Sequence, residues 1–335
     1  MIFHFPFVLQ IDVTPWCNLS CMHCRTSHGA SGEFGSKEWI NILDPIFNAF
    51  PGKIQWVAIG GGEPTLYPDL KELIAYVSKK TRIVLLMTNG TIIAKNPLLL
   101  DELIAAGLNR IQLSLESPDC NIHDQIRGTG NFELVLAAAS ICRERNIDLA
   151  FRMTLNGLNW TKYREFVSLC ERLGAKEANL RKVIPVGNAE AYFAWNCISQ
   201  ENHKKILEDF LGIQKMSAVL INSEDPFRFV VDPRFSRRGS GNKEGFRGCP
   251  AGTTHAYINP EGKVRPCSNV PEILGDLKTQ SFLEIWNNHE WMKRLRKRDY
   301  EKCVNCRFKN ICGGCRAMAK HHTGDWWGVD PDCWI

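Results

Sequence analysis

The feature that most constrains the fold is a regular alternation of apolar runs with amphipathic stretches over residues 7–222. Six of these runs have the length and composition of buried strands, and they span residues 7–13, 54–60, 82–88, 110–116, 149–155 and 177–184. The segments between them carry apolar residues at helical spacing. Repeated strand and helix units predict a parallel sheet with helices outside it. Six units favour a (β/α)6 barrel of the TIM type, complete or partial, over an open sheet.

The sequence changes in character after residue 222. Residues 223–248 are rich in Gly, Pro and Arg and predict a bridging segment. Residues 249–335 carry half of the fourteen cysteines and show one convincing helical stretch, at 281–298. A segment so poor in long apolar runs is expected to need metal to hold its fold. We therefore expect a core barrel at 1–222, a bridge at 223–248 and a small cysteine-rich domain at 249–335.

Composition excludes several classes of protein. With 44% hydrophobic and 23% charged residues, the chain is typical of a soluble globular protein. The net charge of +5 is mild and does not by itself indicate nucleic-acid binding. No apolar run approaches the length of a membrane span, and the N-terminus lacks the features of a signal peptide. We expect a cytoplasmic protein that binds neither nucleic acid nor membranes.

The number of cysteines is unusual for such a protein. In a reducing compartment, clustered cysteines indicate metal binding or catalysis rather than disulfides. Ten of them fall into two groups, whereas four are scattered singly, at Cys120, Cys142, Cys170 and Cys197. Isolated cysteines are usually small buried packing residues, and this is the expectation for these four.

The first group has the spacing C-x3-C-x2-C and consists of Cys17, Cys21 and Cys24. It follows the first strand, where sites collect in parallel sheets and barrels. Structural zinc requires four ligands, and His23, the available fourth, is strained by its position beside Cys24. Three thiolates can instead hold a four-iron cluster and leave one iron open for a substrate or cofactor.

The stretch CNLSCMHC at 17–24 resembles the signature of the radical S-adenosylmethionine (SAM) superfamily, in which SAM chelates the open iron through its amino and carboxylate groups. GGGEP at 60–64 resembles the Gly-Gly-Glu motif of this family, and SLES at 114–117 ends the fourth strand. The resemblance implies that SAM is contacted by Gly61, Gly62, Glu63, Ser114, Glu116 and Arg152. For Arg152, a salt bridge inside the barrel mouth is the alternative.

The second group combines C-x12-G-x4-C with C-x2-C-x5-C-x2-C and a last cysteine. A zinc ribbon is one interpretation, but the five residues between the two C-x2-C pairs are too few for two ordinary zinc knuckles. The spacing resembles the SPASM domain, which carries two auxiliary four-iron clusters. The resemblance implies one cluster on Cys303, Cys306, Cys312 and Cys333. It implies a nearer cluster on Cys249, Cys267 and Cys315, with either an open iron or a non-cysteine fourth ligand.

Together the resemblances imply an enzyme with three [4Fe-4S] clusters, SAM and a reduced flavodoxin- or ferredoxin-type electron donor. Such an enzyme cleaves SAM reductively to a 5′-deoxyadenosyl radical, which removes a hydrogen atom from the substrate. No catalytic residue is selected by the sequence, although Cys120, which follows the fourth strand, is a candidate hydrogen donor.

Three functions remain open. The first is oxidative maturation of a ribosomally made peptide, with or without a separate leader-peptide-binding protein. The second is biosynthesis of a tetrapyrrole or another small-molecule cofactor, because the tail CGGCRAMAKHHTGDWWGVDPDC is similar to that of haem-pathway enzymes. The third is a non-catalytic iron–sulfur or zinc-binding module, against which the set of SAM motifs counts strongly.

Overall fold

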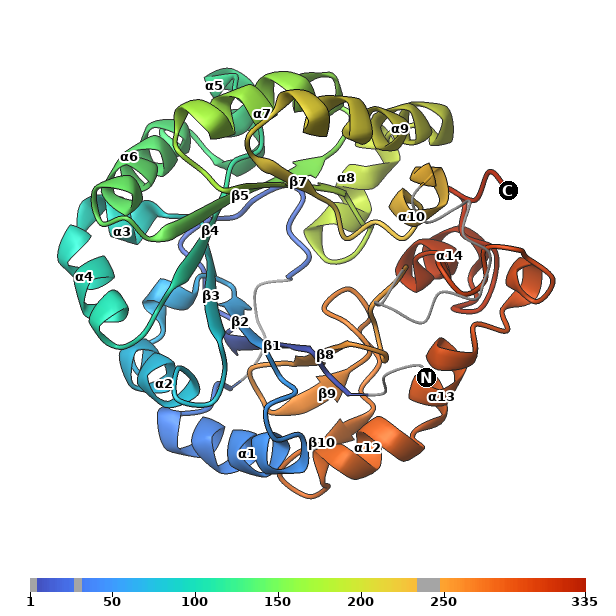
Figure 1. Ribbon diagram of the computed structural model, residues 1–335, viewed down its shortest axis with the longest axis horizontal. Helices are drawn as coiled ribbons and strands as arrows, with labels where there is room; N and C mark the ends of the chain where they lie inside the picture. Colours follow the sequence, from blue (N-terminus) through green and yellow to red (C-terminus); the bar gives the residue numbers. More distant parts are fainter. Residues whose placement is uncertain (1–4, 27–31, 234–247) are drawn as a thin grey trace.

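The six predicted strands are all present, each within two residues of its expected ends, and every neighbouring pair among them is parallel. The computed structural model describes residues 5–26, 32–233 and 248–335. The strands are β1 (Val8–Thr14), β2 (Trp56–Gly61), β3 (Ile83–Thr88), β4 (Arg110–Ser114), β5 (Asp148–Leu155) and β6 (Glu177–Lys182). Figure 1 shows them curving inside a ring of helices, as a partial barrel does.

The helices that form this ring are α1 (Ser36–Ala49), α2 (Leu70–Val77), α3 (Thr91–Lys95), α4 (Pro97–Ala105), α5 (Cys120–Arg127), α6 (Asn131–Glu144), α7 (Tyr163–Arg172), α8 (Asn188–Asn196) and α9 (Gln200–Met216). The helices from α1 to α7 lie in the segments between strands, where helical spacing predicts them, and α8 and α9 follow the last predicted strand. The predicted alternation of strand and helix is therefore confirmed.

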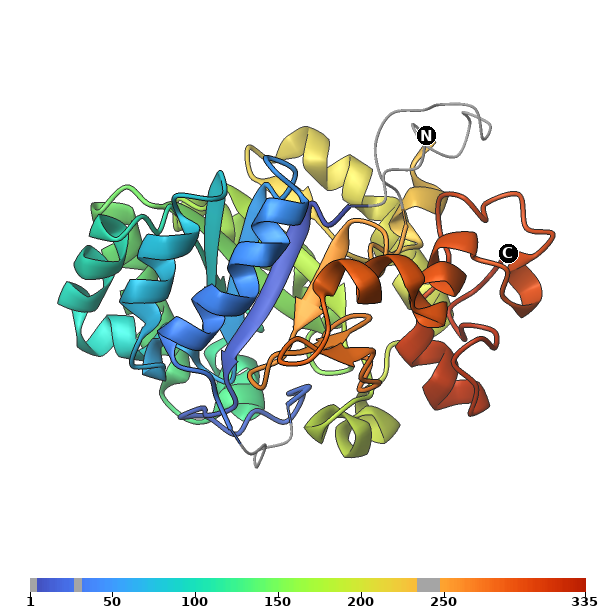
Figure 2. The same ribbon diagram turned by 90° about the horizontal axis from the view of Figure 1, so that it is seen from below.

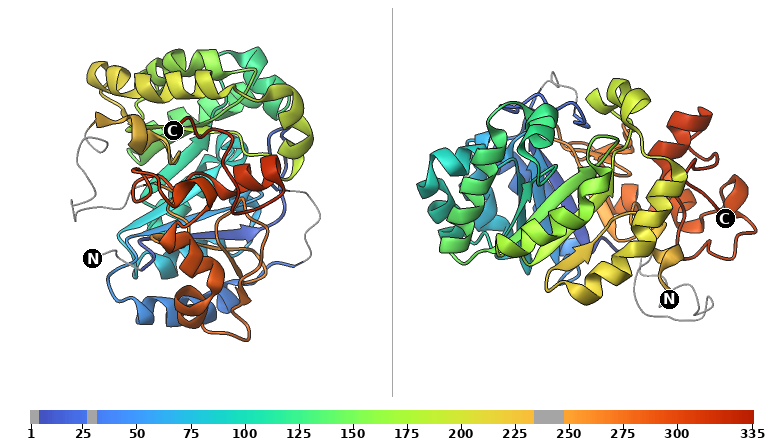
Figure 3. Two further views of the ribbon diagram at one scale, coloured as in Figure 1. Left: turned by 90° about the vertical axis from the view of Figure 1, so that its right-hand side faces the viewer. Right: turned by 90° about the horizontal axis from the view of Figure 1, so that it is seen from above.

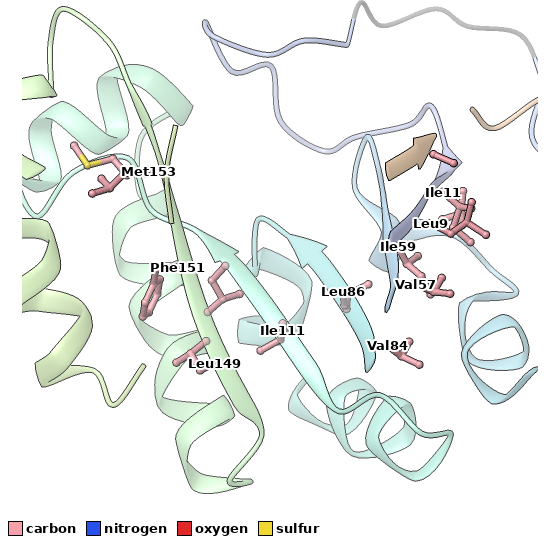
Figure 4. Close-up of a cluster of buried hydrophobic side chains, with 14 of the residues drawn as sticks. Leu9, Ile11, Val57, Ile59, Val84, Leu86, Ile111, Leu149, Phe151 and Met153 are labelled. Atoms are coloured by element: carbon pink, nitrogen blue, oxygen red, sulfur yellow. The ribbon is translucent and has the colours of Figure 1, made fainter. Parts of the chain in front are cut away.

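Alternation along each strand separates the core from the barrel interior. In β1, Leu9, Ile11 and Val13 are fully buried against the helices, as Figure 4 shows for Leu9 and Ile11. Gln10 and Asp12, the residues between them, point to the opposite face because successive side chains of a strand alternate. The outer face is thus an apolar core, and the inner face carries polar groups.

The sheet continues beyond the predicted barrel in both directions. At one edge β7 (Leu220–Asn222) pairs in parallel with β6. At the other edge β8 (His255–Ile258) pairs in parallel with β1, followed by β9 (Lys263–Arg265) and β10 (Gly275–Asp276) in antiparallel hairpins. Among the described residues the resulting order is β10-β9-β8-β1-β2-β3-β4-β5-β6-β7, an open sheet of ten strands. The cysteine-rich segment therefore extends the barrel sheet, as the orange strands of Figure 2 show.

The cysteine-rich segment contains more helix than expected. The single helix predicted at 281–298 is two helices, α12 (Phe282–Asn288) and α13 (Glu290–Lys297). His289 separates them because its backbone is extended, and its Nδ1 accepts a hydrogen bond from Trp291 N at 3.2 Å. A further helix, α14 (Arg316–Thr323), was not predicted.

The last residues of the chain pack back on the barrel. Trp334 lies against Phe227, just before α10 (Arg228–Val231), with ring centroids 4.8 Å apart. Gln200 Nε2, in α9, donates to Pro331 O at 2.8 Å. Figure 3 shows the C-terminus beside these helices. None of the helices in the described ranges is long and apolar enough to cross a membrane.

Candidate active site

The barrel interior contains a cavity of about 590 Å³ that joins the two cysteine groups. Its wall includes all three cysteines of the first group and three of the seven in the second, namely Cys17, Cys21, Cys24, Cys249, Cys267 and Cys315. The remainder of the wall comes from the inner faces of the strands, from the loops that follow them and from the cysteine-rich segment, including Trp291 and Asp330. We call this space the main cavity. Its volume lies in the range of small-molecule and cofactor sites.

The loop that carries the first cysteine group is held by backbone bonds to two other parts of the barrel. After β2, Gly62 N donates to Thr14 O at 2.8 Å and Glu63 N donates to Trp16 O at 2.7 Å. At the start of α8, Ala189 N donates to Cys24 O at 3.2 Å. The loop is thus fixed at both ends, which gives the three thiols defined positions at the carboxyl end of β1.

The two glycines of the Gly-Gly-Glu motif are required by this loop. A Cβ atom on Gly62 would lie 2.1 Å from Trp16 O, and one on Gly61, whose φ is +139°, would lie 2.4 Å from Thr14 O. The sequence predicts that these glycines make room for SAM. In the structure, the backbone of the cysteine loop fills the space beside them.

Replacing Gly62 with alanine is therefore expected to displace the cysteine loop. The added methyl group cannot fit beside Trp16 O, and overpacking of this kind costs about 1–3 kcal/mol. We expect a reduced iron content after anaerobic reconstitution and at least a tenfold fall in SAM cleavage. Gly212→Ala is the matched control, because a Cβ there would lie 3.6 Å from its nearest neighbour, Asp209 Oδ1. Unchanged iron and SAM cleavage in Gly62→Ala would contradict this prediction.

The thiol sulfurs of the loop are surrounded by hydrogen-bond donors. Leu19 N lies 3.4 Å from Cys17 Sγ, Thr26 N lies 3.4 Å from Cys24 Sγ, and Arg127 Nη1 lies 3.8 Å from Cys21 Sγ. Burial raises the pKa of Cys17 to about 11 and also raises the pKa of Cys21, so these two thiols, when free, are protonated at neutral pH. A bound metal cluster would supply the charge that stabilises the thiolates, and N–H donors tune such clusters.

Glu63 is held in place by protein donors. Its Oε1 accepts from Thr65 N, Thr65 Oγ1 and Thr88 Oγ1, at 3.1, 2.6 and 2.6 Å. Its Oε2 accepts from Asn89 N at 2.8 Å and has acceptor capacity left. Burial raises the pKa of this carboxyl. Glu63 lines the main cavity, so the free capacity of Oε2 is compatible with the predicted bond to an amino group.

Glu116 occupies a different place from the one predicted. It is fully buried, and it is not part of the wall of the main cavity. Its Oε1 accepts from His23 Nε2 at 3.2 Å and from Arg127 Nη2 at 2.7 Å, and its Oε2 accepts from Thr154 N at 2.8 Å. Burial opposes its ionisation, but His23 and Arg127 together lower the pKa of Glu116 well below its usual range. Glu116 therefore positions the cysteine loop through His23 and Arg127.

Ser114 lines the main cavity, as the sequence predicts, and so does Arg152. The guanidinium of Arg152 donates from Nη2 to Glu224 Oε2 at 3.4 Å, and Arg181 Nη1 donates to the same oxygen at 2.7 Å. The salt bridge considered as the alternative for Arg152 is thus present. Sequence reasoning missed Glu224 and Arg181, because residues 72 and 43 positions apart in the chain carry no sequence signal of contact.

Two of the four scattered cysteines are packing residues. Cys142 and Cys170 are fully buried between helices and sheet, as expected. Cys120 and Cys197 are exposed, so the packing prediction is wrong for them. Cys120 begins α5 and does not line the main cavity, which removes the geometric basis for a role as hydrogen donor.

The other four cysteines of the second group line a separate small cavity. They are Cys303, Cys306, Cys312 and Cys333, the four that the resemblance assigns to one cluster. Phe308 N lies 3.4 Å from Cys306 Sγ, and Gly314 N lies 3.4 Å from Cys312 Sγ. The donors repeat the pattern of the first group. The two cavities are linked by the bond from Cys249 N to Cys312 O at 2.9 Å.

The arrangement of these side chains is not that of single-ion sites. Within residues 5–26, 32–233 and 248–335, no three His, Cys, Asp or Glu side chains are placed to hold one metal ion. Thiolates bound to one zinc lie about 2.3 Å from the ion and therefore close to one another. A four-iron cluster is wider, and each of its thiolates binds a different iron. The thiols that line the two cavities number three, three and four, which is the ligand set that such clusters take.

Comparison with known proteins identifies both parts of the chain. Residues 11–170 match the radical SAM superfamily, and residues 249–307 match SPASM, an iron–sulfur cluster-binding domain. An AdoMet-dependent heme synthase of Methanosarcina barkeri is 30% identical over 98% of this chain and 96% of that protein. The mycofactocin maturase MftC of Mycobacterium tuberculosis is 30% identical over 98% of this chain and 83% of that protein.

The fold is also found among solved structures. Streptococcus suis SuiB bound to its precursor peptide SuiA gives a TM-score of 0.80 at 18% identity, covering 100% of this chain and 77% of that chain. At this identity the likeness shows the fold alone. The sequence matches carry the family, and they extend over nearly the whole chain. The protein belongs to the radical SAM superfamily and is an enzyme of its SPASM branch, which uses SAM and iron–sulfur clusters.

Proposed function

We propose that this enzyme cleaves SAM at the first cysteine group and oxidises a carbon–hydrogen bond of a peptide bound in the main cavity. The observation that carries the proposal is the composition of the cavity wall, which unites the first cysteine group with Cys249, Cys267 and Cys315. A substrate in this space touches both the site of radical formation and an acceptor for the electron that oxidation releases.

The cysteines would hold three [4Fe-4S] clusters. Cys17, Cys21 and Cys24 would hold the cluster that binds SAM. Cys249, Cys267 and Cys315 would hold the nearer auxiliary cluster, and the distant one would sit on Cys303, Cys306, Cys312 and Cys333. When bound, the clusters and SAM supply the 5′-deoxyadenosyl radical and take up an electron.

The residues for SAM are those that the structure places beside the cysteine loop. Glu63 Oε2 would accept from the amino group, and Ser114 would contact the ribose or the amino acid part. Gly61 and Gly62 would act by holding the loop. Arg127, rather than Arg152, would face the carboxylate, because Arg127 lines the main cavity 3.8 Å from Cys21 Sγ.

Further partners follow from the proposed chemistry. The first cluster requires a reduced electron carrier of the flavodoxin or ferredoxin type. Such carriers and SAM are present in the cytoplasm, where we place the enzyme. A separate leader-peptide-binding protein is compatible with a peptide substrate.

A peptide substrate is supported by the maturases among the relatives. The mycofactocin maturases align over 98% of this chain, and a PqqA peptide cyclase of Granulibacter bethesdensis is 24% identical over 98% of it. A tetrapyrrole is the second candidate. It is favoured by the heme synthase relative, because this chain covers 96% of that protein but 83% of the maturase.

The test is a turnover assay on the anaerobically reconstituted enzyme with SAM and dithionite. One reaction contains any short peptide encoded beside the gene, and another contains a porphyrin with free propionate groups. Mass spectrometry follows 5′-deoxyadenosine and the mass of each substrate. We expect deoxyadenosine together with a changed peptide mass.

A changed porphyrin with an unchanged peptide would transfer the proposal to the second candidate. Absence of deoxyadenosine from enzyme with a full iron content would refute SAM cleavage altogether. The control is the enzyme without dithionite, which should form no deoxyadenosine because the first cluster is not reduced.

A further inference from the structure

We propose that Arg152 and Arg181 bind a carboxylate of the peptide substrate in the main cavity, between the two cysteine groups. The inference rests on the proposed function and narrows its substrate class. It assigns to Arg152 a role other than the SAM contact that the sequence predicts.

The two arginines are neighbours on the inner face of the barrel. Arg152 lies on β5 opposite Asn179 of β6, and Thr154 lies opposite Arg181. Because alternate residues of a strand share a face, these four side chains point the same way, and all four line the main cavity. Rigid strands therefore carry the two guanidiniums side by side.

The charges of this cluster do not balance. Glu224 faces both arginines through one oxygen, Oε2, and within the described part of the chain neither guanidinium has another hydrogen bond. Burial favours the neutral acid, but the two arginines lower the pKa of Glu224 to about 2, so it carries one negative charge. Burial lowers the pKa of the nearby His255 to about 4, so it adds no charge at neutral pH. Two cations share one anion, and an anionic ligand would complete the cluster.

Three other cations of the cavity wall have carboxylate partners. Arg25 is paired with Asp12 at 2.6 Å, Lys182 with Asp332 at 2.6 Å, and Arg110 with Asp148 at 3.2 Å. Arg316, also in the wall, donates to the carbonyls of Trp326 and Gly328, and its Nε has no hydrogen-bond partner in the described structure. Arg152 and Arg181 differ from it because they are two cations that share a single carboxylate oxygen. Arg181 shares the wall of the main cavity with the auxiliary cysteines Cys249, Cys267 and Cys315.

Asn179 gives a second and independent indication of a ligand. Its side chain is buried, with 5% of the residue exposed, and in the described structure its Oδ1 has no hydrogen-bond partner. A buried acceptor without a donor is costly, so an N–H group of a ligand is expected there. A peptide offers a carboxylate and a backbone N–H within a few bonds of each other, whereas the propionate of a porphyrin has no such donor beside it. The unpartnered Oδ1 of Asn179 thus favours a peptide over a porphyrin as the ligand of this site.

The test measures how much binding depends on the carboxylate. The probes are the short peptide encoded beside the gene, a porphyrin with free propionates, and the methyl ester of each. Binding to the reconstituted enzyme with SAM, without reductant, is measured by fluorescence quenching. We expect the free peptide to bind at least tenfold more tightly than its ester.

The variants then locate the carboxylate. Arg152→Gln and Arg181→Gln should each reduce the preference for acid over ester about tenfold, and the lysine replacements should restore part of it. Glu224→Gln should increase the affinity for the free acid, because it removes the competing anion. Arg110→Gln is the matched control. It removes an arginine of the same cavity that already has carboxylate partners, so the preference should remain.

Each other outcome overturns the assignment. A preference for acid over ester that persists in both glutamine variants would refute it, as would a peptide ester that binds as tightly as the acid. Carboxylate dependence for the porphyrin alone would assign the site to a tetrapyrrole. Weaker SAM binding in Arg152→Gln, with the preference intact, would return Arg152 to the SAM site. Failure of the proposed function would be detected separately, because the wild-type enzyme would then form no 5′-deoxyadenosine in the turnover assay.

Discussion

Replacing Cys17, Cys21 and Cys24 together with alanine is expected to abolish formation of 5′-deoxyadenosine. The iron content should fall from about twelve to about eight atoms per chain, because one of three four-iron clusters loses its thiolates. The loop itself should persist, since its bonds to Gly62, Glu63 and Ala189 are made by the backbone. Iron analysis, electron paramagnetic resonance of the reduced protein and deoxyadenosine assays test the three parts of this prediction.

The matched control is the double replacement Cys120→Ala and Cys197→Ala. Both thiols are exposed, and neither lines the main cavity or the small cavity. Iron and deoxyadenosine should therefore stay at their wild-type values. Twelve irons retained in the triple variant, or deoxyadenosine formed by it, would show that the first cluster is held elsewhere.

The barrel could be predicted from the sequence because its strands and helices are each specified by the pattern of residues within the element itself. Each strand is recognisable in the sequence as a short apolar run, and the helices are recognisable because their apolar residues recur every three or four positions. The extension of the sheet could not be predicted in the same way. β8, β9 and β10 have four, three and two residues, and β8 is set by pairing with β1, almost 250 residues away along the chain. Strands this short form because they pair with a neighbouring strand, and their own sequence is not sufficient to predict them.

The candidate active site likewise has a part that could be predicted from short sequence patterns and a part that depends on distant contacts. The cysteines and the Gly-Gly-Glu motif form short patterns that can be recognised in the sequence alone. Arg127 could not be found in this way, because its role depends on meeting both Glu116 and Cys21, which lies 106 positions earlier. The position of Glu116 outside the wall of the main cavity could not be predicted for a related reason. A carboxylate at the end of a strand can be recognised in the sequence, but the buried cationic side chains that form hydrogen bonds with it cannot.

Lys182 connects the barrel to the last cysteine. It ends β6 and is almost completely buried, and its Nζ donates to Asp332 Oδ1 and Oδ2 at 2.6 and 2.8 Å. Asp332 directly precedes Cys333. His203 stands beside it, with Nδ1 3.5 Å from Asp332 Oδ2 and Nε2 2.8 Å from Asp225 Oδ2. One lysine thus compensates the carboxylate that fixes the C-terminal loop on the barrel.

Lys182→Met is expected to lower the free energy of unfolding by about 3–5 kcal/mol, because it leaves Asp332 buried without its cation. The neighbouring carboxyl of Asp330 would not reduce this loss of stability. Burial, with the charge of Asp332, already raises its pKa to about 6, so near neutral pH it adds to the uncompensated charge. The variant should also lose iron from the cluster assigned to Cys333, since the loop is no longer held.

Lys176→Met is the control, because Lys176 lies just before the same strand with its side chain 68% exposed, and its loss should cost little. Denaturation of the two variants and iron analysis after reconstitution give the comparison. A double variant, Lys182→Met with Asp332→Asn, separates charge from packing. It should recover part of the lost stability if the unpaired carboxylate is the cause, and none if the loss comes from the lysine stem. Equal stability of Lys182→Met and Lys176→Met would show that the C-terminal loop is held by its apolar contacts, such as that between Trp334 and Phe227.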